Sequence, residues 1–214
     1  MFNQKFIVVF EGIDGCGKTT QCNMLCDYLS GQGIRNRYEK FPGSSFIDKR
    51  ILDEIKTNCT DKELFYKFIT EMRAYETSKT SFLNFSNNLN YEIIVRDRYK
   101  YSDNVNLKVY GVKKDVIYLL SDWLPEPDLL FYLDIDVSVA VKRIQLRGGK
   151  IHWHENEEYL SRLSNYFKKE LKSTNTKLHK LDASKNIDSL HTEIISAFID
   201  SMSKVDSSLF VQTS

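Results

Sequence analysis

Long apolar stretches and charge of one sign are both missing from this chain of 214 residues. Its apolar runs fall well below the roughly 18 residues that a membrane-spanning helix needs, so we expect no membrane partner. The formal net charge of +1 provides no extended field for nucleic acid, so we expect no nucleic-acid partner. Residues 1–5 show no charged segment leading into the apolar core of a secretory signal. This composition favours a small ligand held by local basic groups.

Cysteine, proline and glycine are also scarce. The four cysteines have no C-x-x-C spacing, and three of them, Cys16, Cys22 and Cys26, lie close together, so we expect a reducing, cytoplasmic compartment. The three prolines and nine glycines fall between segments of regular apolar periodicity. No linker or internal repeat interrupts the chain. The sequence therefore predicts one domain over residues 1–203 and an aperiodic tail, 204–214, that we expect to fray.

One glycine-rich segment has the spacing and setting of a phosphate-binding loop. Residues Gly12-Ile13-Asp14-Gly15-Cys16-Gly17-Lys18-Thr19 follow the apolar run 6–10 and open a helical stretch near Thr20. In such loops backbone N–H groups surround an anion, the lysine reaches the outer phosphates and the threonine hydroxyl holds Mg²⁺. We therefore expect residues 12–20 to bind a nucleoside triphosphate, with magnesium as cofactor. The alternative is a glycine-rich turn with a surface lysine.

Apolar periodicity divides the chain into alternating strands and helices. We expect strands at 6–10, 34–41, 91–95, 129–133 and 178–181, and helices at about 20–30, 47–55, 61–87, 112–123, 136–147, 155–171 and 187–202. Asp61 is the expected N-cap of the longest helix. This alternation predicts an α/β, three-layer P-loop NTPase fold, with a five-stranded parallel sheet, helices on both faces and a short lid. The binding crevice should lie at the carboxyl ends of the strands.

Several blocks resemble the thymidylate kinase family. The segment from Phe10 to Gln21 is similar to its phosphate-loop signature, and Asp97-Arg98-Tyr99 with Ser102 resembles its D-R-Y-x-x-S segment. Blocks at 124–129, 132–134, 141–143 and 181–184 follow in the family's order, so the resemblance runs from about residue 5 to 198. It implies a P-loop kinase of nucleoside monophosphates with ATP as donor and Mg²⁺ as cofactor.

The resemblance also implies roles around the phosphates. Asp97 would orient Mg²⁺ or its water ligands together with Thr19, and Asp14 would lie near the sugar and phosphate of the acceptor. Phosphoryl transfer between two anionic nucleotides needs this neutralisation and alignment more than covalent chemistry. The alternative for Asp97 is a strand-end carboxylate that pairs with Arg96 or Arg98.

Basic residues would hold the acceptor. Arg98 and Arg73 match family positions for the acceptor phosphate and base, and the guanidinium fork suits phosphate geometry. Lys40, which precedes Phe41, matches a further basic position near the acceptor, and both residues are candidates for substrate binding. The alternative for Lys40 is a charged residue that ends an exposed strand.

Residues 143–157 resemble the family's mobile lid. The family supplies a catalytic arginine from the phosphate loop or from the lid, and the loop has none here. Arg147 is therefore the candidate, with Arg143 expected to stack on the donor adenine beside Ala183, and Gly148-Gly149 as a hinge. The alternative is an ordinary helix C-terminus, with basic residues that favour the helix dipole and glycines that cap it.

The region for the acceptor base departs from the family pattern. The family's stacking aromatic residue is replaced by Ile69, with Phe68 one position away, and its tyrosine and glutamine after Ser102 are replaced by residues 103–107, including Asn106. These four named residues remain the candidates for base and sugar contacts. Because a pocket rejects a wrong hydroxyl or amide by leaving polar groups unpaired, the replacements could broaden acceptor choice.

Together these features predict a kinase that transfers the γ-phosphate of ATP to dTMP, giving dTDP for DNA precursor synthesis. One alternative is a kinase with altered or relaxed acceptor choice, such as dUMP or another pyrimidine nucleotide. Alternatives from other classes are a nucleotide-binding regulatory protein with a degenerate acceptor site and a P-loop hydrolase, which would need a water-orienting glutamine. The apolar helices could bury a homodimer interface or only the core of a monomer.

Overall fold

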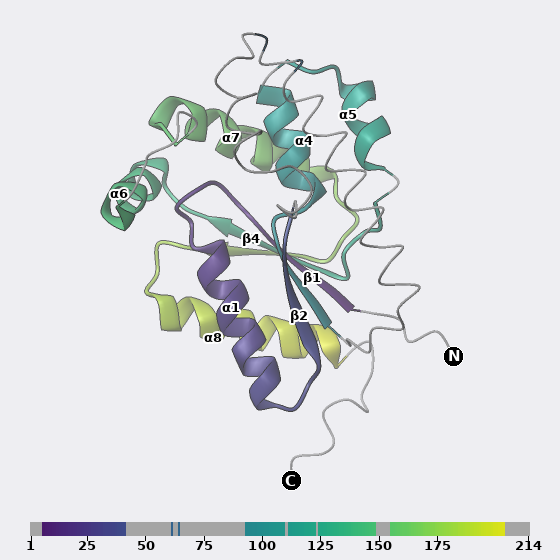
Figure 1. Cartoon of the computed structure of the whole chain (residues 1–214), viewed down its shortest axis with the longest axis vertical. Helices are drawn as coiled ribbons and strands as arrows, with labels where there is room; N and C mark the ends of the chain where they lie inside the picture. Colours follow the sequence, from purple (N-terminus) through teal and green to yellow (C-terminus); the bar gives the residue numbers. More distant parts are fainter. Residues whose placement is uncertain are drawn as a thin grey trace.

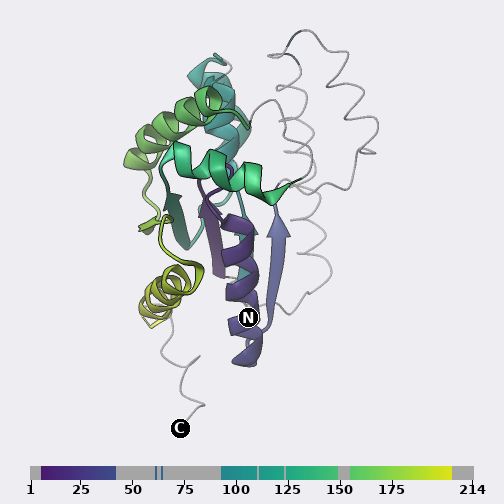
Figure 2. The same ribbon diagram turned by 90° about the vertical axis from the view of Figure 1, so that its left-hand side faces the viewer.

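The computed structural model describes residues 6–41, 61, 64, 93–109, 111–122, 124–148 and 155–203, and Figures 1 and 2 show the arrangement in two views. The strands are β1 (Phe6–Glu11), β2 (Asn36–Lys40), β3 (Ile93–Asp97), β4 (Leu129–Asp134) and β5 (Leu178–Asp182). The helices are α1 (Lys18–Gly31), α4 (Lys100–Val109), α5 (Lys114–Ser121), α6 (Val137–Arg147), α7 (Glu157–Glu170), the short 3₁₀ turn η1 (Leu171–Ser173) and α8 (Ile187–Met202).

All five described strands form one parallel sheet, in the order β2-β3-β1-β4-β5. The central strands β3, β1 and β4 are almost wholly buried, which explains their continuous apolar sequences, whereas β2 and β5 are partly exposed and more polar. In the register of β1 with β3, Phe10 lies opposite Asp97. The end of β1, where the phosphate loop begins, therefore lies next to the end of β3.

Helices cover both faces of the sheet. Helices α1 and α8 pack against each other on one face, and α4 and α7 pack together on the other, as both views show (Figures 1 and 2). Helix α6 leaves the carboxyl end of β4 and runs beyond the ends of the strands toward the phosphate-loop side (Figure 2). The predicted three-layer P-loop fold is confirmed.

The predicted strands and most predicted helices occur with boundaries shifted by a few residues. For the expected N-cap Asp61, the Leu64 backbone N–H donates to Asp61 Oδ1 over 3.0 Å. The rest of the predicted helices 47–55 and 61–87, the middle of the lid at 149–154 and the tail 204–214 lie outside the described residues. The domain and lid boundaries therefore stay predictions.

Helix α4 was not expected from the sequence. Its sequence, KYSDNVNLKV, is largely polar, although Tyr101, Val105 and Val109 recur at helical spacing, and eight of its ten residues are buried. Partners on other segments explain why polar residues are among them: Lys100 Nζ lies 2.6 Å from Glu126 Oε1, and Asn104 Nδ2 lies 3.0 Å from Glu170 Oε1. The short apolar stripe was the signal that the sequence analysis missed, and the polar partners depend on distant segments.

Candidate active site

The phosphate loop joins β1 to α1 in a conformation that requires glycine. Gly12 has a φ of 145°, and a Cβ atom there would lie 2.7 Å from the Leu133 carbonyl oxygen. Gly15 has a φ of 83°, and its Cβ would lie 2.5 Å from the Ala140 carbonyl oxygen. Side chains at these positions would be strained and would collide with backbone atoms. The spacing recognised in the sequence therefore serves close packing of the loop against β4 and α6.

Lys18 begins α1 with its side chain turned back into the loop. Its Nζ donates to the carbonyl oxygens of Gly12 over 2.8 Å and Ile13 over 2.7 Å, and contacts Cys16 Sγ at 3.4 Å. The N-cap, Gly17, has no side chain, and the first turn of α1 contains no acidic residue. Backbone N–H groups and a buried ammonium therefore gather at one helix N-terminus, an arrangement that favours an anion.

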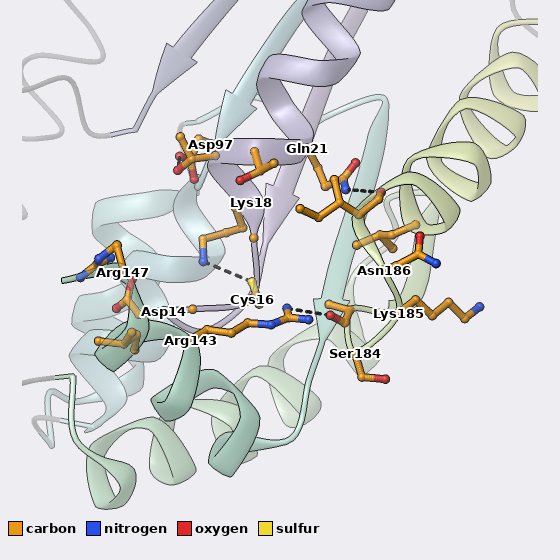
Figure 3. Close-up of a pocket in the computed structure, with 18 of the residues that line it drawn as sticks. Asp14, Cys16, Lys18, Gln21, Asp97, Arg143, Arg147, Ser184, Lys185 and Asn186 are labelled. Carbon is orange, nitrogen blue, oxygen red and sulfur yellow. Dashed lines mark hydrogen bonds between the residues drawn. The ribbon is translucent and has the colours of Figure 1, made fainter.

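A cavity of about 940 Å³ opens above this loop (Figure 3). Four segments contribute its lining: residues 14–21 of the loop and α1, the strand ends at Lys40 and 97–98, one side of α6, and the β5–α8 connection with the first turn of α8. The lining residues from the last two segments are Arg143, Ile144, Arg147, Ala183, Ser184, Lys185, Asn186, Ile187, Asp188 and Leu190. The lining contains more basic than acidic side chains, which suits phosphorylated ligands.

Asp97, at the end of β3, accepts hydrogen bonds from two hydroxyl groups on the same carboxylate oxygen. Thr19 Oγ1 donates to Oδ2 over 2.5 Å, and the Tyr38 hydroxyl donates to Oδ2 over 3.2 Å. Burial and the negative charge of Asp97 raise the pKa of Tyr38, so its phenol stays a donor. The other oxygen, Oδ1, is buried without a hydrogen-bond partner among the described residues.

The arginines on either side of Asp97 pair with other carboxylates. Among the described residues, Asp97 therefore forms no ion pair with Arg96 or Arg98. Arg96 Nε lies 3.0 Å from Glu39 Oε2, and Arg98 Nη2 pairs with Asp14 Oδ1. Asp97 is thus oriented by neutral hydroxyls and can present its charge to a cation.

Arg98 joins the end of β3 to the phosphate loop. Its φ is 73°, and it is the single non-glycine residue with positive φ in the described part of the chain. Its backbone N–H donates to the Phe10 carbonyl oxygen over 2.9 Å, and its Nη1 donates to Ser102 Oγ over 3.3 Å. Burial opposes the charge of this guanidinium, but the carboxylates around it, led by Asp14, outweigh that effect and raise its pKa. Arg98 is therefore a permanent cation beside the loop.

Glu11 lies directly beneath this turn, and sequence analysis did not single it out. Its Oε1 accepts from the backbone N–H groups of Tyr99 over 2.8 Å and Ser102 over 3.0 Å, and its Oε2 accepts from the Ser102 hydroxyl. Burial raises its pKa to about 7, although the hydrogen bonds from Ser102 and the charge of Arg98 oppose that rise. A carboxylate that ends a buried apolar strand was the available signal, because such a group needs partners.

The two α6 arginines expected to serve the donor both line the cavity. Arg143 extends from α6 along the cavity, and its Nη1 donates to the Ala183 carbonyl oxygen over 2.8 Å, which brings together two predicted ATP-binding residues (Figure 3). Arg147 Nη2 lies 2.7 Å from Glu155 Oε1. The Arg147 side chain is 55% exposed and that of Glu155 is 4% exposed, so the arginine can leave this contact more easily than the glutamate.

The residues predicted to bind the acceptor differ in where they lie: some line the cavity, some are engaged in contacts within the protein, and some fall outside the described residues. Lys40 lines the cavity. Phe41 is buried, and its ring packs edge-on against Tyr99 with centroids 5.3 Å apart. Ser102 is bound by Glu11 and Arg98, while Asn106 Nδ2 donates to the Ser102 carbonyl oxygen over 2.7 Å and Asn106 Oδ1 accepts from the Tyr159 hydroxyl over 2.7 Å. The candidates Phe68, Ile69 and Arg73 lie outside the described residues.

Comparison with known proteins shows which family the chain belongs to. The family model described as Thymidylate kinase matches residues 10–194, from the end of β1 into α8. The chain belongs to the thymidylate kinase family. The match includes the phosphate loop, Asp97-Arg98 and both α6 arginines. The resemblance inferred from the sequence blocks is therefore confirmed, and as a family member the chain is a kinase, an ATP-dependent phosphotransferase.

Individual relatives align with this chain over at least 90% of their own length. A probable thymidylate kinase of Methanococcus maripaludis is 32% identical over 203 residues, which cover 92% of this chain and 96% of the relative. Thymidylate kinases of Fervidobacterium nodosum and Dictyostelium discoideum are 29% and 28% identical, and the alignments cover 89% and 96% of this chain. None of the helices described for this family member is long and apolar enough to cross a membrane.

Proposed function

We propose that this chain transfers the γ-phosphoryl group of ATP to dTMP and releases ADP and dTDP. The observation that carries the proposal is a single cavity lined by the phosphate loop, for a donor, and by Lys40, Asp14 and Arg98, for an anionic acceptor. Family membership and the names of the relatives favour dTMP over a relaxed set of acceptors and over a regulatory protein. In-line transfer requires the attacking acceptor oxygen, the γ-phosphorus and the leaving oxygen to lie roughly in line, so donor and acceptor would have to share one cavity.

The donor would be held from three directions. Loop N–H groups and Lys18 would bind its β- and γ-phosphates, and the weak 3.4 Å contact of Lys18 with Cys16 Sγ is the one that a phosphate oxygen could replace at least cost. Arg143, oriented by the Ala183 carbonyl oxygen, would stack on the adenine. Arg147 would move from Glu155 to the transferring phosphoryl group when the lid, 143–157, closes.

Magnesium would be held by Thr19 and Asp97. The fit rests on the buried Asp97 Oδ1, which has no described partner, and on the hydroxyl and carboxylate oxygens that Mg²⁺ prefers. A magnesium site in a kinase needs only one or two protein ligands, because Mg²⁺ usually keeps several waters. When bound, the ion would neutralise negative charge on the phosphates of the donor.

On the acceptor side, Arg98 would bind the phosphate and Lys40 would add charge. Both polar atoms of the Asn106 amide group are engaged with Ser102 and Tyr159, so Asn106 would shape the pocket through these bonds rather than offer a free amide to a sugar or base. Ser102 would act in the same indirect way, because its hydroxyl is shared by Glu11 and Arg98. Contacts of Phe68, Ile69 and Arg73 with the base remain proposals from the family resemblance.

The test is ATP-dependent, acceptor-dependent release of ADP in the presence of Mg²⁺, measured with dTMP, dUMP, dCMP, dGMP, UMP and CMP. We expect kcat/KM for dTMP to exceed that for each other acceptor by at least about tenfold, a modest ratio for a pocket that recognises polar groups. Lys18→Ala should abolish the signal. Comparable turnover of several acceptors would support the relaxed kinase instead, and tight ATP binding without acceptor-dependent release would support the regulatory protein.

A homodimer and a cytoplasmic location stay predictions, as does a single domain over residues 1–203. Light scattering of the purified chain would test the first of these.

A further inference from the structure

Tyr38 contacts Asp97, the carboxylate that we assign to magnesium. No motif in the sequence identifies Tyr38 as part of the site. It lies in β2 opposite Val95 of β3, and two residues further along the same strands Lys40 lies opposite Asp97. The Tyr38 hydroxyl reaches Asp97 Oδ2 over 3.2 Å, between residues 59 positions apart. Parallel pairing of β2 with β3 brings the two side chains together.

The two oxygens of Asp97 have different surroundings. Oδ2 accepts from both Tyr38 and Thr19, whereas Oδ1 is buried and has no described partner. A buried carboxylate oxygen without a partner is unfavourable, so its orientation requires a cause. Two donors on Oδ2 provide that cause, because rotation of the carboxylate about its Cβ–Cγ bond would break at least one of these hydrogen bonds.

The charge of Asp97 is preserved at the same time. Arg96 pairs with Glu39 over 3.0 Å and Arg98 pairs with Asp14, so the hydrogen bonds that Asp97 accepts from described residues come from neutral hydroxyl groups. A lysine or arginine in place of Tyr38 could also orient the carboxylate, but it would offset the negative charge that a divalent cation needs. A phenol orients the group without this cost.

We propose that Tyr38 is a positioning residue of the magnesium site, whose hydroxyl holds Asp97 so that Oδ1 stays available to the ion or to one of its water ligands. The inference rests on the proposed assignment of Thr19 and Asp97 to magnesium. Without the Tyr38 hydroxyl, Thr19 is the one remaining described donor to Oδ2. Because the Thr19 oxygen is itself a proposed ligand of the ion, it cannot be relied on to fix the carboxylate alone.

The test measures metal-dependent nucleotide binding rather than turnover. The affinity of the full chain for the β,γ-methylene analogue of ATP is determined by calorimetry with and without Mg²⁺. The dissociation constant without Mg²⁺, divided by the dissociation constant with Mg²⁺, is then compared between wild type and Tyr38→Phe. Partners of metal ligands typically change metal affinity by roughly 10–100-fold, so we expect this ratio to fall by about tenfold. Affinity without Mg²⁺ should not change.

The matched control is Tyr28→Phe, since Tyr28 lies in α1 and also packs half-buried against the core but does not line the cavity. Its ratio should equal that of wild type, and Asp97→Asn should lower the ratio at least as much as Tyr38→Phe. A Tyr38→Phe protein with a wild-type ratio overturns the inference and leaves the proposed function intact, even if the variant unfolds at a lower temperature. A wild-type protein that binds the analogue equally with and without Mg²⁺ overturns the magnesium assignment and the inference with it.

Discussion

The Asp14 carboxylate and the Arg98 guanidinium form an ion pair across 84 positions of the sequence, and it joins the phosphate loop to the end of β3. Both residues line the cavity. Arg98 keeps a second contact, from Nη1 to Ser102 Oγ, so its guanidinium is held at two points. An acceptor phosphate at this position would meet a fork that is already oriented, at the place where donor and acceptor must meet.

Replacing Arg98 tests the acceptor side. Arg98→Lys keeps the positive charge but loses the planar guanidinium that can bind two phosphate oxygens at once. We expect kcat/KM for dTMP to fall by roughly 10²-fold, which is a typical loss when one partner of a buried charge pair is truncated. Affinity for ATP should change little. Steady-state kinetics with varied dTMP measures this, and Arg35→Lys on the exposed surface is the control. An unchanged kcat/KM in Arg98→Lys would remove Arg98 from the acceptor site.

Replacing Arg147 tests the lid. If Arg147 stabilises the transferring phosphoryl group, Arg147→Ala should lower kcat by roughly 10²–10³-fold and leave the KM for ATP nearly unchanged. Lys142→Ala, which removes an exposed cation from the same helix, should behave as wild type. Glu155→Gln separates the alternatives: if Arg147 acts only through its ion pair with Glu155, both variants should show the same loss.

Replacing Arg143 tests the adenine position. Arg143→Ala removes the stacking surface and the hydrogen bond to the Ala183 carbonyl oxygen. Both interactions are the same in the ground state and in the transition state, so we expect the KM for ATP to rise by about tenfold with kcat nearly constant. Initial rates at saturating dTMP and varied ATP measure the effect. A loss confined to kcat would mean that Arg143, rather than Arg147, acts on the transferring group.

The pH dependence of stability tests Glu11. Its pKa is raised from 4.5 to about 7 in the folded chain, so between these values the folded chain binds more of this proton than the unfolded chain. The contribution of Glu11 to the free energy of unfolding is therefore largest below pH 4.5 and is lost as the pH rises toward 7, by about 3 kcal/mol in total.

Urea unfolding of wild type and Glu11→Gln at pH 5, 6, 7 and 7.5 measures this contribution. Glutamine does not titrate and keeps an oxygen for the Tyr99 and Ser102 N–H groups, so the variant should show a smaller fall in stability over this range. Parallel pH curves for the two proteins would show that Glu11 keeps an ordinary pKa.

The phosphate loop, the central strands and the candidate donor residues could be predicted from the sequence. These features depend on local properties: a glycine at a backbone conformation that other residues rarely adopt, as at Gly15, and continuous apolar residues where a strand is buried on both faces, as in β1. Order along the chain also places the phosphate loop after the end of β1 and Asp97 at the end of β3, because the carboxyl ends of parallel strands share one edge of the sheet.

Features that depend on partners distant in the sequence become visible only in the folded chain. Polar residues of helix α4 can be buried because Glu126 and Glu170, on other segments, bind Lys100 and Asn104. Glu11 acquires its role from the turn at Tyr99 and Ser102, and Tyr38 from its contact with Asp97. The loop after β1, where we propose that phosphates bind, could be recognised from the sequence alone, since glycine conformation and strand burial are local properties. Which polar side chains orient the charged groups depends on pairs that only folding brings together.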